Sequence, residues 1–327
     1  MTATDISVVI PAYNAASFIV EALDAICAQS VAPQEIIVVD DKSSDDTAAV
    51  VERHAARCSL PILLLCREAN SGGPARPLNE GIALARCPLI AINEHDDLMM
   101  PDRLEKQRWC FRRAPHVGLV SCYATIENYE CGKPAAYNTS MDLQSLSARP
   151  LGNSCYLIPA TAVFAELIRS QNWFLRSLSG CLLPKAVWAA LGGFNETLRI
   201  AADADFILRM LGRYDLAVVA DWLYRYRLFA NHLYLSAGVD AKQEYATIYR
   251  NLLRHPCGKL RESVRSRLRN ELQGVAYELR RRGRLRASAN AYGRYILSGG
   301  SIGHAISGLC KIAVASVTHK SRREVRV

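Results

Sequence analysis

Two groups of carboxylates follow short apolar runs within the first hundred residues. Asp40 and Asp41 are adjacent after one run, and Glu94, Asp96 and Asp97 follow another. Carboxylates held this close repel one another and therefore require a cationic partner. Mg²⁺ and Mn²⁺ favour oxygen ligands and are often shared with substrate phosphates. The second group is therefore expected to bind a divalent metal and, through it, a phosphate-bearing substrate.

Each group also has a simpler interpretation. Asp40 and Asp41 could simply cap the next helix and have no other role, and residues 94–97 could form a solvated acidic turn. A helix N-cap explains one acidic side chain, but not two adjacent ones at the end of a strand. We therefore favour the metal and ligand site.

The segments around these acids alternate between strand-like and helix-like sequence. Four short apolar runs are expected to be strands, at residues 7–10, 35–39, 62–65 and 89–92. Three amphipathic segments between them have the length of crossover helices, at residues 18–29, 46–57 and 75–85. This alternation predicts a parallel sheet covered by helices. Ligands bind beyond the carboxyl ends of such strands, so both acidic groups and the turn at residues 11–14 should meet at one edge.

Charge is distributed unevenly along the 327 residues. The chain is 50% hydrophobic and carries a net charge of +9. Residues 250–327 contain 18 basic and 4 acidic residues, or +14, which leaves −5 for residues 1–249. The hydrophobic content excludes disorder as the main state. Because no recognised nucleic-acid module accompanies the charge, nucleic-acid binding is not expected.

The basic region beyond residue 240 reads as helical, and two interpretations of it stay open. One is a solvated helix face. The other is an anchor to an anionic membrane surface, based on the arginines at 280–282, the apolar segment at 305–317 and the basic cluster at 320–326. No run is long enough for a membrane-spanning helix and no leader is visible, which predicts a cytoplasmic protein. The eleven cysteines form no CxxC pair and are expected to be reduced.

The ordered series of motifs resembles the family 2 inverting glycosyltransferases with the GT-A fold. The motifs are SVVIPAYN at 7–14, EIIVVDDKSSDDT at 35–47, NSGGP at 70–74, NEGI at 79–82, EHDDLMMPDRLEKQ at 94–107 and LGGFNE at 191–196, followed by Asp203 and FILR at 206–209. The resemblance covers about residues 5–230. It implies an α/β protein with a mostly parallel central sheet flanked by helices. A nucleotide-sugar-binding half (1–115) and an acceptor half (116–240) would form the GT-A domain, with residues 241–327 as a basic helical extension.

The resemblance implies a nucleoside diphosphate sugar, a UDP- or dTDP-sugar, as donor. Contacts to the donor fall on Pro11, Tyr13, Asp40, Asp41, Asn79 and Asp96. Coordination of Mn²⁺ or Mg²⁺ falls on Glu94 and Asp96, which match the family's DxD motif, together with Asp97 and His232. The acceptor would be a hydroxyl of a glycan or a lipid-linked glycan, in the synthesis of a surface polysaccharide or glycolipid.

The general base of an inverting displacement would be Asp203. A carboxylate with an ordinary pKa is a weak base, so burial or acidic neighbours such as Asp205 would have to raise that pKa. The chain departs from the family in having Glu94 in place of Asp, and Ala202 in place of the Glu that precedes the base. These departures favour an alternative, a noncatalytic member of the same fold that binds nucleotide or serves as a scaffold.

Overall fold

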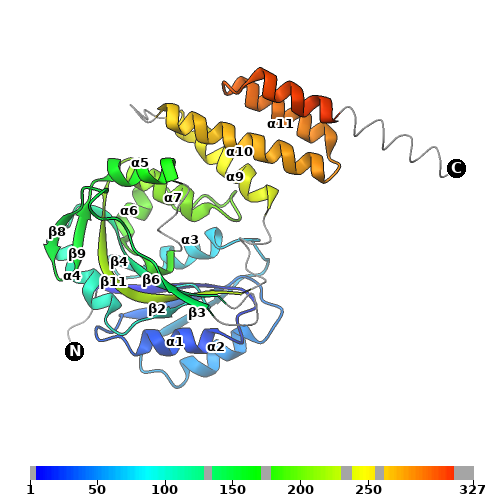
Figure 1. Cartoon of the computed structure of the whole chain (residues 1–327). Helices are drawn as coiled ribbons and strands as arrows, with labels where there is room; N and C mark the ends of the chain where they lie inside the picture. The colour runs from blue at the N-terminus through cyan, green and yellow to red at the C-terminus, as the bar shows by residue number, and fades with distance from the viewer. Residues whose placement is uncertain (1–4, 129–134, 171–177, 230–237, 255–260, 313–327) are drawn as a thin grey trace. The chain divides into compact units, whose positions relative to one another are not determined.

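The computed structural model describes residues 5–128, 135–170, 178–229, 238–254 and 261–312 (Figure 1). The chain divides into two compact units, residues 1–232 and residues 233–327. The first unit contains the sheet and the second is helical. Each unit is described separately.

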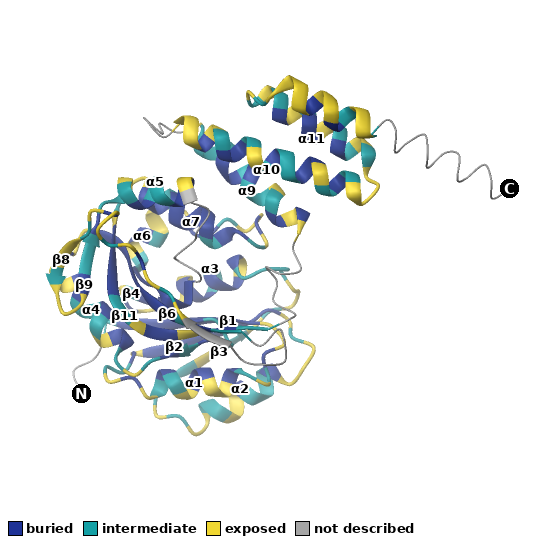
Figure 2. Ribbon diagram, viewed as in Figure 1, coloured by how far each residue is buried: buried dark blue, intermediate teal, exposed yellow. Residues whose placement is uncertain are grey.

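The first half of the sheet is parallel, as the sequence predicts. Its four strands lie in the order β3-β2-β1-β4, with bounds β1 Ile6–Ala12, β2 Glu35–Asp40, β3 Ile62–Cys66 and β4 Leu89–Ile92. All residues of β1 and β2 are buried (Figure 2), because helices cover both faces of the sheet. Helices α1 (Ile19–Cys27) and α2 (Thr47–Ala55) cover one face, and α3 (Ala75–Leu84) covers the other (Figure 1).

The second half of the sheet continues from β4 through an antiparallel strand. The order is β4-β10-β6-β11-β9-β8, with β10 Leu182–Pro184, β6 Val117–Asn128, β11 Asp215–Leu228, β9 Cys155–Ile158 and β8 Arg149–Gly152. Two short strands pair outside this order, β5 (Leu98–Met99) with β11 and β7 (Ala135–Asn138) with β6. The helices of this half are α4 Arg103–Arg113, α5 Ala160–Ser170, α6 Lys185–Ala190 and α7 Ala202–Leu211, with a 3-10 turn at Leu178–Gly180.

The C-terminal unit contains α9 (Val239–Leu252), α10 (Arg261–Arg281), α11 (Leu285–Leu297) and a further helical stretch at 302–312. The apolar stripe of α10 is buried, including Val264, Leu268, Leu272, Val275 and Leu279. Gly283 follows α10 with a φ of +71°, a conformation that glycine adopts without strain. None of the helices in the described residues is long and apolar enough to span a membrane.

One expectation about the cysteines is wrong. Cys110 on α4 and Cys155 on β9 form a disulfide, with their Cα atoms 6.1 Å apart. The sequence gives no signal for this pairing because 45 residues separate the two positions, and only the packing of α4 against the sheet brings them within bonding reach.

Candidate active site

The ends of β1, β2 and β4 meet at one edge of the sheet. Ala12 pairs in register with Asp40, and the Asp41 N–H donates to the Ala12 carbonyl at 2.8 Å. On the other side of β1, the Asn93 N–H donates to the Val9 carbonyl at 3.1 Å. The turn after β1 therefore lies between the two acidic groups, as expected for the carboxyl edge of a parallel sheet.

Asp41 organises the Gly-rich loop after β3. Its buried carboxylate accepts hydrogen bonds from the Ser71 N–H at 3.0 Å and the Ser71 hydroxyl at 2.7 Å, and it forms an ion pair with Arg67. Arg67 also donates to Glu80 on α3 at 2.9 Å. Asp41, which the sequence predicts to contact the nucleoside, thus also holds the Gly-rich loop in place.

The turns after β1 and β2 hold the other predicted nucleoside contacts. Tyr13 is 48% exposed and is free to receive a planar ligand, whereas Asp40 is buried and accepts from the Ser43 hydroxyl. The Pro11 carbonyl lies 3.2 Å from Nδ1 of His95. Lys42 has a φ of +62°, in the left-handed region. Glycine would be less strained there, so the turn carries a cost that its hydrogen bonds must offset.

Glu94, Asp96 and Asp97 form a compact group of oxygen ligands. One ligand atom from each lies within 4.8 Å of the others. Asp97 is fully buried; burial, and then the charges of Asp96 and Glu94, raise its carboxyl pKa well above the ordinary value. Its Oδ2 atom has no hydrogen-bond partner among the described residues. An orphaned carboxylate oxygen beside two further carboxylates fits a divalent cation.

Arg227 on β11 contacts the acidic group, and the sequence gives no sign of this contact. Its main-chain N–H donates to Oδ1 of Asp97 at 3.0 Å, and its Nε donates to the Asp96 carbonyl. A guanidinium nitrogen also contacts Glu21 at 2.6 Å. Arg227 is 130 residues from Asp97 in sequence, so only the pairing of β11 within the sheet brings the two together.

Arg103 and Gln107 explain part of the motif at 94–107. Both side chains are fully buried, and Arg103 donates to the carbonyls of Ile92 and Cys181 at 3.1 Å. Gln107 donates to the carbonyls of Val120 and Gly180 at 3.1 and 2.7 Å. The second half of the motif thus holds the main chain around the acidic loop in place through buried hydrogen bonds.

Asp203 stands in the first turn of α7, half-buried, and accepts from the Ala204 N–H at 2.6 Å. The phenol of Tyr226 on β11 is affected by the charges of both Asp203 and the acidic group. Burial raises the pKa of Tyr226, and the charges of Glu94, Asp97, Asp96 and Asp203 raise it further. The charges of all four carboxylates thus act on one phenol. That Asp203 serves the same site as the acidic group stays a prediction.

Asp205, the acidic neighbour that the sequence suggested for Asp203, has a charged partner on its own helix. Its buried carboxylate forms an ion pair with Nε of Arg209 at 2.8 Å. Arg209 also donates to the carbonyls of Leu191 and Gly193 at 2.7 and 2.9 Å. Asp205 thus anchors α7 to the Gly-Gly turn, and its charge is offset by the guanidinium.

Asn79 has its hydrogen-bonding groups occupied by the protein. Its Oδ1 accepts from the indole of Trp188 at 3.0 Å and from the Phe194 N–H at 2.8 Å. Its Nδ2 donates to the Phe194 carbonyl at 2.9 Å and to Glu196 at 3.0 Å. This geometry favours positioning of the Gly-Gly-Phe turn over direct donor contact. His232, the fourth predicted metal ligand, lies outside the described residues.

Comparison with known proteins gives a family match for the N-terminal part of the chain. Residues 7–144 match the family Glycosyl transferase family 2. The match covers less than half of the 327 residues. The matched region contains both acidic groups, and Asp203 lies beyond it.

Curated relatives of this chain include a succinoglycan biosynthesis protein, ExoO, of Rhizobium meliloti, 39% identical over 31% of this chain and 28% of its own length. A poly(ribitol-phosphate) beta-glucosyltransferase of Bacillus spizizenii is 35% identical over 32% of this chain and 16% of its own length. The chain thus matches less than a third of either relative. An uncharacterized glycosyltransferase of Rickettsia prowazekii, RP339, is 24% identical over 86% of this chain and 82% of its own length.

Solved structures show that the fold is the predicted GT-A arrangement. Residues 1–349 of S. aureus TarS in complex with UDP-GlcNAc align with a TM-score of 0.66 at 20% identity, over 90% of this chain and 81% of that one. The mannosyltransferase PcManGT of Pyrobaculum calidifontis, in complex with GDP-Man and Mn²⁺, aligns with a TM-score of 0.56 at 19% identity, over 96% and 81%.

Proposed function

We propose that this chain is a metal-dependent inverting glycosyltransferase that moves a sugar from a nucleoside diphosphate sugar to a hydroxyl acceptor. The observation that carries the proposal is the set of three carboxylates within 4.8 Å, at the sheet edge that also bears Tyr13 and Asp41. Nucleotide-sugar complexes of two structures of the same fold support this class of donor.

Glu94, Asp96 and Asp97 would hold Mn²⁺ or Mg²⁺. When bound, such an ion offsets the negative charge of a departing diphosphate. Tyr13 offers an exposed ring for the base, and the turns at Asp40 and Asp41 bound the nucleoside site. Asp203 would accept the proton of the acceptor hydroxyl as that oxygen attacks the anomeric carbon. The UDP- or dTDP-sugar preference and the hexosyl nature of the transferred group belong to the same proposal.

Two observations favour the alternative, a noncatalytic member of the fold that binds nucleotide or acts as a scaffold. Ala202 removes one acidic neighbour of Asp203, and Arg209 offsets the charge of the other, Asp205. The pKa of the base would then depend on burial and on the acidic group across the site.

A thermal-stabilisation screen tests the donor proposal. We expect the unfolding temperature to rise with a nucleotide sugar plus Mn²⁺ and to rise much less with either alone. The variant Asp96→Asn should lose this synergy. Exposed Asp142, outside the site, provides the control Asp142→Asn, which should keep it. Stabilisation that is the same with and without metal would contradict the metal assignment, and hydrolysis or transfer of the sugar would separate enzyme from scaffold.

We further propose a glycan or lipid-linked acceptor in surface polysaccharide or glycolipid synthesis, at the cytoplasmic face of a membrane. The biosynthetic relatives and the charge of +14 on residues 250–327 support this proposal. Co-sedimentation of the full chain with anionic vesicles tests it. Failure to bind at low salt would remove the membrane proposal without affecting the donor site.

A further inference from the structure

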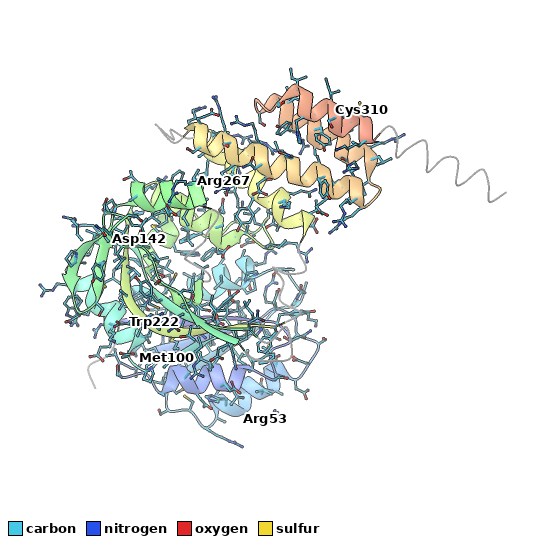
Figure 3. All side chains as sticks on the ribbon, viewed as in Figure 1. Arg53, Met100, Asp142, Trp222, Arg267 and Cys310 are labelled. Carbon is cyan, nitrogen blue, oxygen red and sulfur yellow. A yellow bond between two sulfur atoms is a disulfide. The ribbon has the colours of Figure 1, made fainter. Side chains whose placement is uncertain are left out.

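The C-terminal unit contains a cavity of about 610 Å³ that is separate from the acidic site. Its lining comes from the end of α9, from α10 and from the end of α11. Figure 3 draws the side chains of these helices. Four arginines contribute to the lining, Arg250, Arg265, Arg269 and Arg294, against a single carboxylate.

The carboxylate, Glu262, offsets only part of this charge. It pairs with Arg269 at 2.7 Å and lies 3.8 Å from Arg265. Within the described residues, neither Arg250 nor Arg294 forms an ion pair. Burial lowers the pKa of Arg250, and the positive charges of Arg294 and Arg254 lower it further. The two guanidinium groups thus lie close enough to repel, and an anion between them would relieve the repulsion.

The same cavity has an apolar component. Leu268 and Leu272 are buried in its lining, and Leu297 at the rim is 88% exposed. The helical stretch after α11 exposes Ile302 by 62% and Ile306 by 53%. Exposed aliphatic side chains beside unpaired arginines are the composition expected where a phosphate group and a hydrocarbon chain bind together.

The lining distinguishes a lipid from a nucleotide. None of the described residues that line the cavity is aromatic, so no ring is available to stack on a base. A Cβ atom on Gly299 would lie 3.6 Å from Nη1 of Arg269, which places this arginine at the end of α11 near Leu297. Charged and apolar side chains therefore line the same cavity.

We propose that this cavity binds the phosphate headgroup of an anionic lipid, with the hydrocarbon chain lying along Leu297. This inference gives the proposed membrane association a defined site in the described helices. It is independent of the metal and donor site, which lies in the first unit.

The test is calorimetric titration of the full chain at low salt with dihexanoyl phosphatidic acid, a short-chain lipid that stays monomeric. We expect saturable binding that weakens about thirtyfold in the double variant Arg250→Gln/Arg294→Gln. The matched control Arg284→Gln/Arg286→Gln removes the same charge from exposed positions outside the lining and should change affinity less than about twofold. Leu297→Ser should weaken binding several-fold without changing the unfolding temperature.

Two further titrations separate the sources of binding. Inorganic phosphate should bind far more weakly than the lipid, and dihexanoyl phosphatidylcholine should not bind. Equal affinity for inorganic phosphate would overturn the lipid assignment, and equal loss in both double variants would indicate diffuse surface charge and overturn the site. Donor-dependent thermal stabilisation of the same variants reports on the first unit, so failure here is distinguishable from failure of the glycosyltransferase proposal.

Discussion

The main-chain N–H of Arg227 donates to Oδ1 of Asp97 at 3.0 Å, and this bond ties the acidic loop after β4 to strand β11. The same arginine donates from its side chain to the Asp96 carbonyl and to Glu21. Arg227 thus fixes two of the three predicted metal ligands without being one itself.

Replacing Arg227 with Gln should weaken metal-dependent donor binding or activity by about 10- to 100-fold, the range seen when partners that orient metal ligands are removed. Titration of Mn²⁺ in the presence of donor measures the effect. The control is Arg225→Gln, two residues away on the same strand, whose half-exposed side chain contacts Glu127 at 3.5 Å. Equal effects of the two variants would contradict an orienting role for Arg227.

Substitution of Asp203 should affect catalysis, whereas substitution of Asp205 should affect stability. Asp203→Asn should lower kcat by about 10²- to 10⁴-fold, the usual contribution of a general base, while nucleotide binding and the unfolding temperature stay unchanged. Asp205→Asn should lower the unfolding temperature because it breaks the ion pair with Arg209. Transfer activity that survives in Asp203→Asn would remove this residue as the base.

At the predicted nucleoside site, substitution of Tyr13 should affect nucleotide binding alone, whereas substitution of Asp41 should also affect stability. Tyr13→Ala should weaken nucleotide binding about tenfold with no change in stability, because its ring is half exposed. Asp41→Asn should also cost about 2 kcal/mol of folding free energy, because Arg67 then keeps only Glu80 as a charged partner. Denaturant unfolding and nucleotide titration measure the two effects. A Tyr13 variant that binds nucleotide like the parent would argue against stacking.

Glu35 gives a pH dependence that is independent of the metal site. Burial alone would raise the pKa of its carboxyl, but hydrogen bonds from the Arg86 N–H, the Ser7 hydroxyl and the Arg86 guanidinium lower it overall. A lowered folded-state pKa contributes stability that is present above the ordinary carboxyl pKa of about 4.3 and is lost as the pH falls through the folded value. Glu35→Gln should therefore cost about 1–3 kcal/mol at neutral pH and progressively less in acid. A constant cost across that range would contradict the assignment.

The disulfide between Cys110 and Cys155 can be checked by counting thiols in the denatured chain. Two fewer thiols should react in the absence of reductant than after reduction. A Cys110→Ser variant without reductant should then react with one thiol more than the parent. Equal thiol counts in the parent with and without reductant would restore the expectation that all cysteines are reduced.

The sequence by itself determined the parallel half of the sheet and its acidic edge. Buried parallel strands require unbroken apolar runs such as those at β1 and β2, and ligands collect at the carboxyl ends of these strands, so local pattern carries both pieces of information. The ordered motifs added a resemblance to family 2, whose model matches residues 7–144, and the GT-A fold, which the structural relatives confirm.

Only the tertiary structure decided which polar groups support that edge. The contacts of Arg227 with Asp97, of Asp205 with Arg209 and of Asn79 with the Gly-Gly-Phe turn depend on side-chain directions and on packing. The disulfide and the arginine-lined cavity of the C-terminal unit arise in the same way, from surfaces that meet only after folding. Local patterns carry hydrophobic periodicity and turn chemistry, whereas contacts between distant segments are fixed by how the elements pack.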